Sequence, residues 1–174
     1  FHYRQYSAVE LAERRTFEDV WYLMVHGELP DSAQASAFTA RAAGLRALPA
    51  EVGALLELCA DTTPLEALRS AVSVLGAVSG WGPTLDLDAH ELRSQALRLG
   101  AVVPTIVAAA YRTAQGRPPV TPRADLGHVA NLLWMTTEQE PAPAQVRALE
   151  QYLLLTVDHG FNASTFAARV ITST

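Results

Sequence analysis

The sequence contains no lysine: all 13 basic residues are arginine, against 18 acidic residues, and the formal net charge is -5. This charge balance excludes the basic face that is typical of nucleic-acid-binding proteins and the basic amphipathic face that binds anionic membranes. Cysteine is almost absent as well, because Cys59 is the single one, and an internal disulfide framework is therefore excluded. We expect a cytoplasmic protein that binds neither nucleic acid nor a membrane.

Long apolar runs and familiar site motifs are also missing. The longest apolar run, residues 101–110, is interrupted by Pro104 and is much shorter than the ~20 residues that a membrane span requires. The sequence has no phosphate-binding P-loop, no glycine fingerprint for dinucleotides, no paired zinc-ligand histidines and no nucleophile elbow. Four histidines have no partner at metal-ligand spacing, so we expect no metal site there: His2, His26, His90 and His128.

Nearly all start and stop signals in the sequence are helix signals, and alternating polar and apolar runs are almost absent. The fold is therefore predicted to be all-α. Side chains suited to the N-cap occur at Ser7, Thr16, Asp31, Thr63 and Asp88. The predicted later helices cover about 32–48, 51–58, 64–79, 89–114 with a bend or break at Pro104, 125–135, 143–157, and 163 onward. A proline-rich connection at 116–122 is too short to be a domain linker.

Residues 158–165 read Asp-His-Gly-Phe-Asn-Ala-Ser-Thr and predict a tight corner between two helices. Gly160 suits the left-handed conformation that ends a helix, and Asn162 suits the N-cap of the next one. The first amides of that next helix then point into the corner with the positive end of the helix dipole behind them, which favours a carboxylate ligand. An ordinary helix-turn-helix, with His159 near a helix C-terminus, accounts for the same spacing.

At this corner the sequence resembles the citrate synthase family. Residues 158–170 are similar to the histidine-containing signature that precedes that family's catalytic loop. Further similar segments occur in the family's order at residues 3–6, 17–30, 68–73 and 104–106, so the resemblance extends over nearly the whole chain. The first of these, Tyr-Arg-Gln-Tyr, has Gln5 where the family has glycine.

The resemblance implies a multi-helical, homodimeric acyltransferase that joins acetyl-CoA to oxaloacetate, the condensing step of the tricarboxylic acid cycle. It implies no resident cofactor, because acetyl-CoA is a substrate. By position in the motif, His159 and Asn162 match substrate-binding residues, with His159 as an oxaloacetate ligand. Ser164 matches a residue that supports the enol-stabilising catalytic histidine of the family.

In the family, the other catalytic histidines, the catalytic aspartate and the carboxylate-binding arginines follow this signature, and the present sequence ends before them. We therefore expect residues 1–174 to be an incomplete large helical domain that lacks the small CoA-binding domain and is inactive alone. The first residue, Phe1, is not a methionine, which also favours a fragment. Incomplete packing should leave apolar helix faces exposed and promote dimers or larger assemblies; candidate residues are Leu65, Leu68, Val72 and Leu75.

Two alternatives remain compatible with the sequence. A 2-methylcitrate synthase, which uses propionyl-CoA, has the same family features. A non-catalytic helical dimerisation or ligand-binding module would have kept the fold without the chemistry. The residues beyond position 174 discriminate between an enzyme and such a module.

Overall fold

The structure is a computed structural model that describes residues 1–158, 160 and 162–173. Within these residues it contains nine α-helices, one short 3₁₀ helix and a minimal hairpin, which confirms the all-α prediction. The elements are β1 (His2–Tyr3), β2 (Tyr6–Ser7), α1 (Ala8–Arg14), α2 (Phe17–His26), α3 (Ser32–Gly44), α4 (Ala50–Leu58), α5 (Pro64–Val78), η1 (Thr84–Asp86), α6 (Ala89–Thr113), α7 (His128–Thr137), α8 (Pro143–Leu155) and α9 (Ala163–Thr172).

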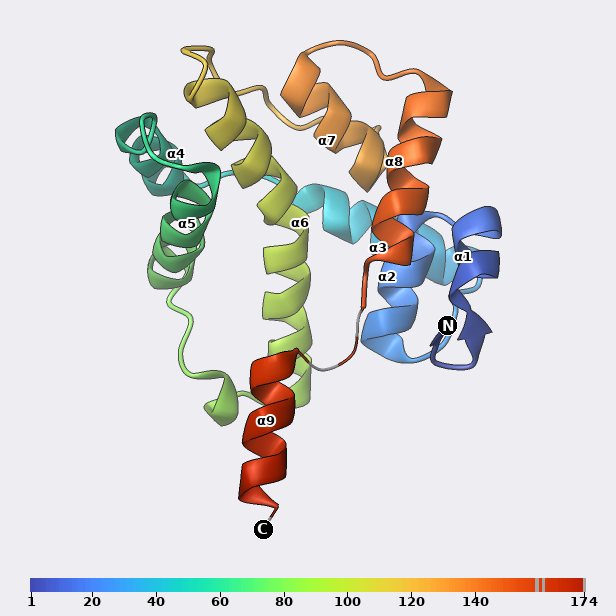
Figure 1. Ribbon diagram of the computed structural model, residues 1–174. Coiled ribbons are helices and arrows are strands. Elements are labelled where there is room, and N and C mark those ends of the chain that lie inside the picture. Colours follow the sequence, from blue (N-terminus) through green and yellow to red (C-terminus); the bar gives the residue numbers. More distant parts are fainter. Residues whose placement is uncertain (159, 161, 174) are drawn as a thin grey trace.

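The long helix α6 runs through the middle of the molecule (Figure 1). Helices α4 and α5 lie on one side of it, and α7 continues the contact on the other side. Helix α8 packs against α1, α2 and α7, so that the N-terminal hairpin and the end of α8 come together although they are far apart in sequence. Helix α9 extends from the body at one end, and none of its described side chains is buried.

Two main apolar clusters form the core. The first lies between α4, α5 and α6 and includes Leu56, Leu75 and Ile106. The second joins the hairpin to α1, α2 and α8 through Tyr3, Leu23 and other buried residues. A smaller cluster joins α2 and α3 to α6. Burial of these side chains removes apolar surface from water and is the main stabilising contribution to the helix packing.

The expectation that Leu65, Leu68, Val72 and Leu75 form an unpartnered face is wrong for Leu75, which is fully buried against α4 and α6. Leu68 and Val72 are partly buried against the same cluster, whereas Leu65 is 75% exposed. Helix α5 thus uses most of its apolar face within this chain, because α4 and α6 flank it on the inner side.

The predicted N-caps at Ser7, Thr16, Asp31, Thr63 and Asp88 are confirmed, each with its side chain accepting a hydrogen bond from a first-turn amide. Of the two predicted effects of Pro104, a bend or a break, the break is wrong, since α6 is one helix of 25 residues with this proline inside it. A proline in a helix removes one backbone hydrogen bond and introduces a steric conflict. Packing of α6 against α3, α4, α5 and α7 offsets that local cost.

Other boundaries differ from the predictions in ways that have local causes. The helix predicted from residue 125 begins at His128, because the Asp125 carboxylate pairs with Arg123 and does not cap a helix. The helix predicted to reach residue 48 ends at Gly44, and the one predicted to reach residue 157 ends at Leu155. The two-residue strands of the hairpin were not predicted, because a segment this short carries no alternating pattern.

No helix in the described part of the chain combines the length and the apolar character that membrane crossing requires. Among the same described residues, no group of three or more histidine, cysteine, aspartate and glutamate side chains is arranged to hold a metal ion.

Candidate functional site

The corner predicted at residues 158–165 follows α8, which ends at Leu155, and includes the start of α9 at Ala163. The Oδ1 atom of Asp158 accepts a hydrogen bond from the Gly160 amide at 2.9 Å. Gly160 has φ 74°, the left-handed conformation predicted for it, but its predicted role as the end of the preceding helix is wrong, because α8 ends at Leu155 with Thr156 as its C-cap. Asn162 is the N-cap of α9, and its Oδ1 accepts a hydrogen bond from the Thr165 amide at 2.7 Å. The described residues of the corner thus include a left-handed glycine, a side-chain contact to its amide and one helix cap.

The structure describes two of the three residues that were predicted to form the site. His159 lies outside the described residues. Asn162 is exposed, and its cap on α9 confirms the predicted structural role but does not test ligand binding. Ser164 lies in the first turn of α9 and is exposed to solvent. The structure thus brings Asn162 and Ser164 to one helix start.

The electrostatic character of this helix start favours an anion. The first turn of α9 contains no acidic residue. The amides of Ala163 and Ser164 precede the capped amide of Thr165, and amides at this position of a helix have no acceptor within the helix itself. Together with the helix dipole, they provide a positive partial charge next to Asn162. A carboxylate or similar group is the chemistry that such a helix start can accommodate.

Tyr3 lies against the end of α8, next to the corner, and was not predicted as a site residue. Its side chain is 2% exposed and packs in the cluster that contains Leu154 and Val157 of α8 and the segment after it. Burial raises the pKa of the Tyr3 hydroxyl above its ordinary value, and the nearby Asp158 charge adds to the effect. Its place in the Tyr-Arg-Gln-Tyr segment, one of those that resemble the family, is the signal that could have identified it.

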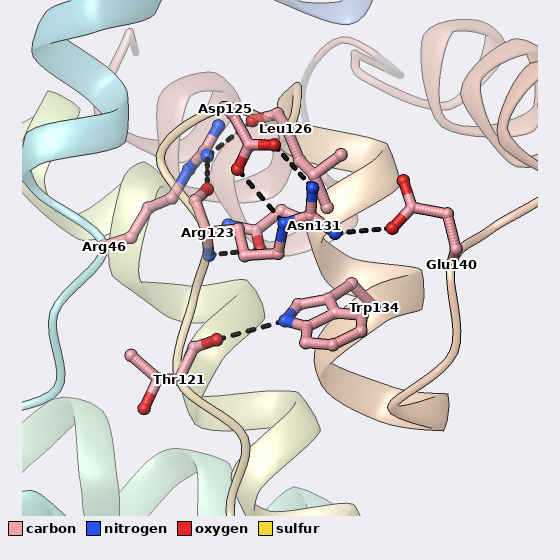
Figure 2. Close-up of polar contacts among 8 residues, drawn as sticks. All are labelled: Arg46, Thr121, Arg123, Asp125, Leu126, Asn131, Trp134 and Glu140. Atoms are coloured by element: carbon pink, nitrogen blue, oxygen red, sulfur yellow. Dashed lines mark hydrogen bonds and ion pairs between the residues drawn. The ribbon is translucent and has the colours of Figure 1, made fainter.

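A second polar centre fixes the connection between α6 and α7 (Figure 2). The buried Arg46 donates from Nη1 to the backbone oxygens of Arg123, at 3.0 Å, and Leu126, at 2.7 Å. From the α7 side, Asn131 accepts a hydrogen bond from the Arg123 amide at 3.0 Å, and the Trp134 indole donates to the Thr121 oxygen at 3.2 Å. These contacts satisfy backbone groups that lack regular secondary structure.

Ion pairs also hold the connection between α6 and α7. Arg123 forms ion pairs with Asp125 and Glu140, and its guanidinium lies 5.3 Å from the centre of the Trp134 ring. Arg112, which is buried, donates to the Pro118 oxygen and pairs with Glu138 at 2.7 Å. These pairs hold the connection against α6 and α7, although Nη1 of the buried Arg112 has no hydrogen-bond partner in the described part of the chain.

The aromatic residues of α2 surround His128, the first residue of α7. Its ring stacks on Phe17 with the centroids 5.0 Å apart, and Trp21 contacts it at 5.1 Å. Its backbone amide donates to the Glu18 carboxylate at 2.6 Å. Burial lowers the pKa of His128 to about 4, and the positive charge of Arg46 contributes to the shift. A neutral, stacked imidazole here belongs to the packing of α7 on α2.

The structure also contains a hollow of about 380 Å³ between the end of α3, α6 and the connection that follows it. Small and apolar side chains form most of its wall, and Thr105 also lines it. None of the residues predicted from the sequence lines this hollow. It is therefore separate from the corner between α8 and α9.

Comparison with known proteins identifies similar sequences over the whole chain. A family model described as "Citrate synthase, C-terminal domain" matches residues 1–174. The chain is 43% identical to a 2-methylcitrate synthase of Mycobacterium tuberculosis over 173 residues, which cover 99% of this chain and 43% of that protein. It is 42% identical to a citrate synthase of Mycolicibacterium smegmatis, covering 99% of this chain and 45% of that protein.

The fold is similar as well. The crystal structure of citrate synthase from Pyrobaculum aerophilum superimposes with a TM-score of 0.83 at 36% sequence identity. The match covers 98% of this chain and 44% of that one. The chain therefore spans less than half the length of the relatives it matches.

Proposed function

Because this chain belongs to the citrate synthase family, we propose that it forms part of an acyltransferase that condenses acetyl-CoA with oxaloacetate to give citrate and CoA. The observation that carries this proposal is the corner between α8 and α9. It combines a left-handed glycine, a capping asparagine and a helix start without acidic residues, and such a corner suits a dicarboxylate substrate.

A second candidate reaction differs only in the acyl group. A 2-methylcitrate synthase is 43% identical to this chain and a citrate synthase 42%, so the two similarities are nearly equal. Propionyl-CoA differs from acetyl-CoA by one methylene group, and pockets discriminate such pairs by only about 10- to 200-fold. We therefore propose propionyl-CoA as the alternative acyl donor.

The proposed roles of the corner residues follow from their places in the motif and in the fold. His159 is proposed as a hydrogen-bonding ligand of oxaloacetate. Asn162 is proposed to line the same pocket, since its side chain already holds the start of α9 at the corner. Ser164 is proposed to orient the enol-stabilising histidine of the complete enzyme, because its hydroxyl is exposed on the first turn of α9.

We further propose that residues 1–174 are part of the large helical domain and that the groups that move protons during the reaction lie outside them. General acid and base groups each contribute about 10²- to 10⁴-fold to such reactions. The isolated 174-residue chain should therefore release no CoA above background from acetyl-CoA and oxaloacetate. Sustained turnover by the pure chain would contradict this proposal.

We also propose that the protein is a homodimer. Several large apolar side chains on α4, α5 and α6 are exposed in the single chain, and apolar surface of this kind is commonly covered by another subunit; they include Leu58, Leu65, Val78, Val107 and Tyr111. Light scattering at micromolar concentration should give twice the mass of one chain or more. A monodisperse monomer would contradict the proposal.

The reaction itself is tested with the full-length protein in a thiol-release assay. Oxaloacetate is held constant, and acetyl-CoA and propionyl-CoA are supplied in separate series. We expect oxaloacetate-dependent release of CoA with at least one donor, and the ratio of the two kcat/KM values identifies the preferred acyl group. No release with either donor, from protein shown to be folded, would favour a non-catalytic helical module.

A further inference from the structure

The buried guanidinium of Arg46 has more hydrogen-bond donors than the described residues have acceptors for them. Arg46 is 2% exposed, and its Nη1 atom donates to the backbone oxygens of Arg123 and Leu126 (Figure 2). The other two nitrogens, Nε and Nη2, are buried and have no hydrogen-bond partner among the described residues. Taking such donors out of water without an acceptor costs free energy, and the cost is largest for a charged group. This edge of the guanidinium therefore requires an acceptor.

The shape of the edge limits what this acceptor can be. Nε and Nη2 of an arginine form a planar fork with two parallel N–H groups, which suits a small acceptor placed between them. The surrounding protein closes both nitrogens off from solvent, so a ligand of substrate size cannot reach them. The backbone is fixed as well, because the Thr105 hydroxyl of α6 donates to the Arg46 oxygen at 2.9 Å. The acceptor must therefore be small and internal.

The carboxylate of Glu18 reaches the same turn from α2. Its Oε1 atom accepts a hydrogen bond from the His128 amide at 2.6 Å, two positions after the Leu126 oxygen that Arg46 contacts at 2.7 Å. Glu18 is 8% exposed, and Arg46 forms none of the ion pairs in the described part of the chain. Two opposite buried charges thus hold the turn before α7 without contacting each other as an ion pair.

The charges around this turn balance one another. Burial lowers the pKa of Arg46, and the Glu18 charge opposes that shift, but a guanidinium stays protonated at neutral pH. Burial lowers the pKa of His128 to about 4, so its imidazole is neutral there. One positive and one negative group remain. A neutral acceptor preserves this balance, whereas a bound anion would add a buried charge without a partner.

We infer that the turn before α7 contains an internal water site, in which a water molecule accepts hydrogen bonds from Nε and Nη2 of Arg46 and donates toward the Glu18 carboxylate. Water can accept and donate at once, and internal waters typically make about three hydrogen bonds to buried polar groups. The resulting water-mediated ion pair holds the start of α7, where the N-cap residue Gly127 has no side chain for the task. The inference does not depend on the function proposed for the corner between α8 and α9.

A crystal structure of the full-length protein, at a resolution that shows ordered water, tests the site directly. We expect an electron-density peak within about 3.2 Å of both Nε and Nη2 of Arg46. A crystal soaked in bromide should show no anomalous peak at this position. A bromide peak would overturn the inference in favour of an anion site. A direct contact between the Arg46 and Glu18 side chains, or an edge without density, would overturn it as well.

A charge variant tests the partnership with Glu18 in solution. Glu18→Gln keeps an acceptor for the His128 amide and removes the charge. Hydrogen exchange in the peptides at the start of α7 should become faster by about two- to tenfold, with a smaller change in the cluster between α4, α5 and α6. Acceleration of equal size in both places, or none at α7, would overturn the role given to Glu18.

The matched control for this variant is Glu51→Gln. Glu51 is the second residue of α4, as Glu18 is of α2, but its side chain is exposed. Glu51→Gln should therefore leave exchange at the start of α7 unchanged. Equal acceleration there in the two variants would show that the effect does not come from the buried charge, and would overturn the inference.

Discussion

The connection between α6 and α7 contrasts with helix α9 in secondary structure and in the burial of side chains. The connection has no regular secondary structure, yet Arg46, Arg112 and Asn131, all buried, bond to its backbone. Helix α9 is regular and capped by Asn162, yet none of its described side chains is buried. Regular hydrogen bonding and burial of side chains are therefore separate properties, since the connection is held by buried side chains without regular structure and α9 is regular with no buried side chain among its described residues.

The difference is informative about function. The connection is fixed by contacts of buried side chains inside this chain, which suits a structural element. The start of α9 offers amides and exposed polar side chains beside a tight turn, which suits a site that is completed by substrate and by further protein. The following predictions test this contrast, beginning with the largest expected effect.

The largest effect should come from the anchored region. Replacing Arg46 by alanine leaves the backbone oxygens of Arg123 and Leu126 without their donor and creates a cavity. We expect the free energy of unfolding to decrease by about 3–5 kcal/mol. The control is Arg41→Ala, because Arg41 is exposed and donates one hydrogen bond to Ser94. Chemical denaturation that gives equal losses for both variants would show that the clamp is not stabilising.

The contrast between α8 and α9 can be measured with two apolar truncations. Leu154 is 0% exposed in the cluster with the hairpin, whereas Phe166 of α9 is 61% exposed. Leu154→Ala should lower the free energy of unfolding of the 174-residue chain by about 2–5 kcal/mol, and Phe166→Ala by less than about 0.5 kcal/mol. Comparable losses in denaturant titrations would mean that α9 is anchored as firmly as α8.

The acid sensitivity of the anchored region should depend on His128. Its folded-state pKa of about 4 lies below the ordinary histidine value of 6.5, so the unfolded chain binds this proton first as the pH falls. The contribution to stability is therefore fully present above pH 6.5 and is lost progressively toward pH 4. The maximum loss is about 3 kcal/mol.

Unfolding measured between these pH values checks this prediction. His128→Gln should flatten the pH dependence in this window, although it also loses the stacking on Phe17. The exposed His90 provides the control, and His90→Gln should retain the original pH dependence. Identical slopes for the two variants would show that His128 is not the sensitive group.

The smallest effect is expected at the start of α9. Asn162→Ala removes the side-chain acceptor of the Thr165 amide, and loss of such an N-cap costs about 1 kcal/mol of helix stability. Hydrogen exchange in α9 should therefore become faster, with little change elsewhere. Ser164→Ala serves as the control, since it changes the same turn without removing a cap. Equal exchange in both variants would show that Asn162 is not the cap that orders this helix.

These regions also explain how far the sequence could predict the structure. The caps of Thr16, Asp31, Thr63 and Asn162 were predictable, because the residues that form them are only three positions apart. The left-handed conformation of Gly160 followed from the same local chemistry. Local signals of this kind determined the helix starts and the outline of the corner.

Contacts over long sequence distances were not predictable in this way. Arg46 bonds to carbonyls 77 and 80 positions away, and no local pattern indicates that an arginine will be buried there. The contact between Tyr3 and the end of α8 joins two segments that are far apart in the sequence. The break predicted at Pro104 is absent for the same reason, because contacts with neighbouring helices, and not local propensity, keep α6 continuous.

The central claim is that the corner between α8 and α9 binds oxaloacetate, and the most direct measurement is the KM for oxaloacetate of His159→Gln in the full-length protein. Removing a hydrogen bond to a charged ligand should weaken binding by about 10- to 150-fold, with the thermal stability of the variant close to that of the unmodified protein. Ser164→Ala in the same assay should lower mainly kcat. An unchanged KM and kcat in His159→Gln, normalised to folded protein, would remove His159 from the site and contradict the account.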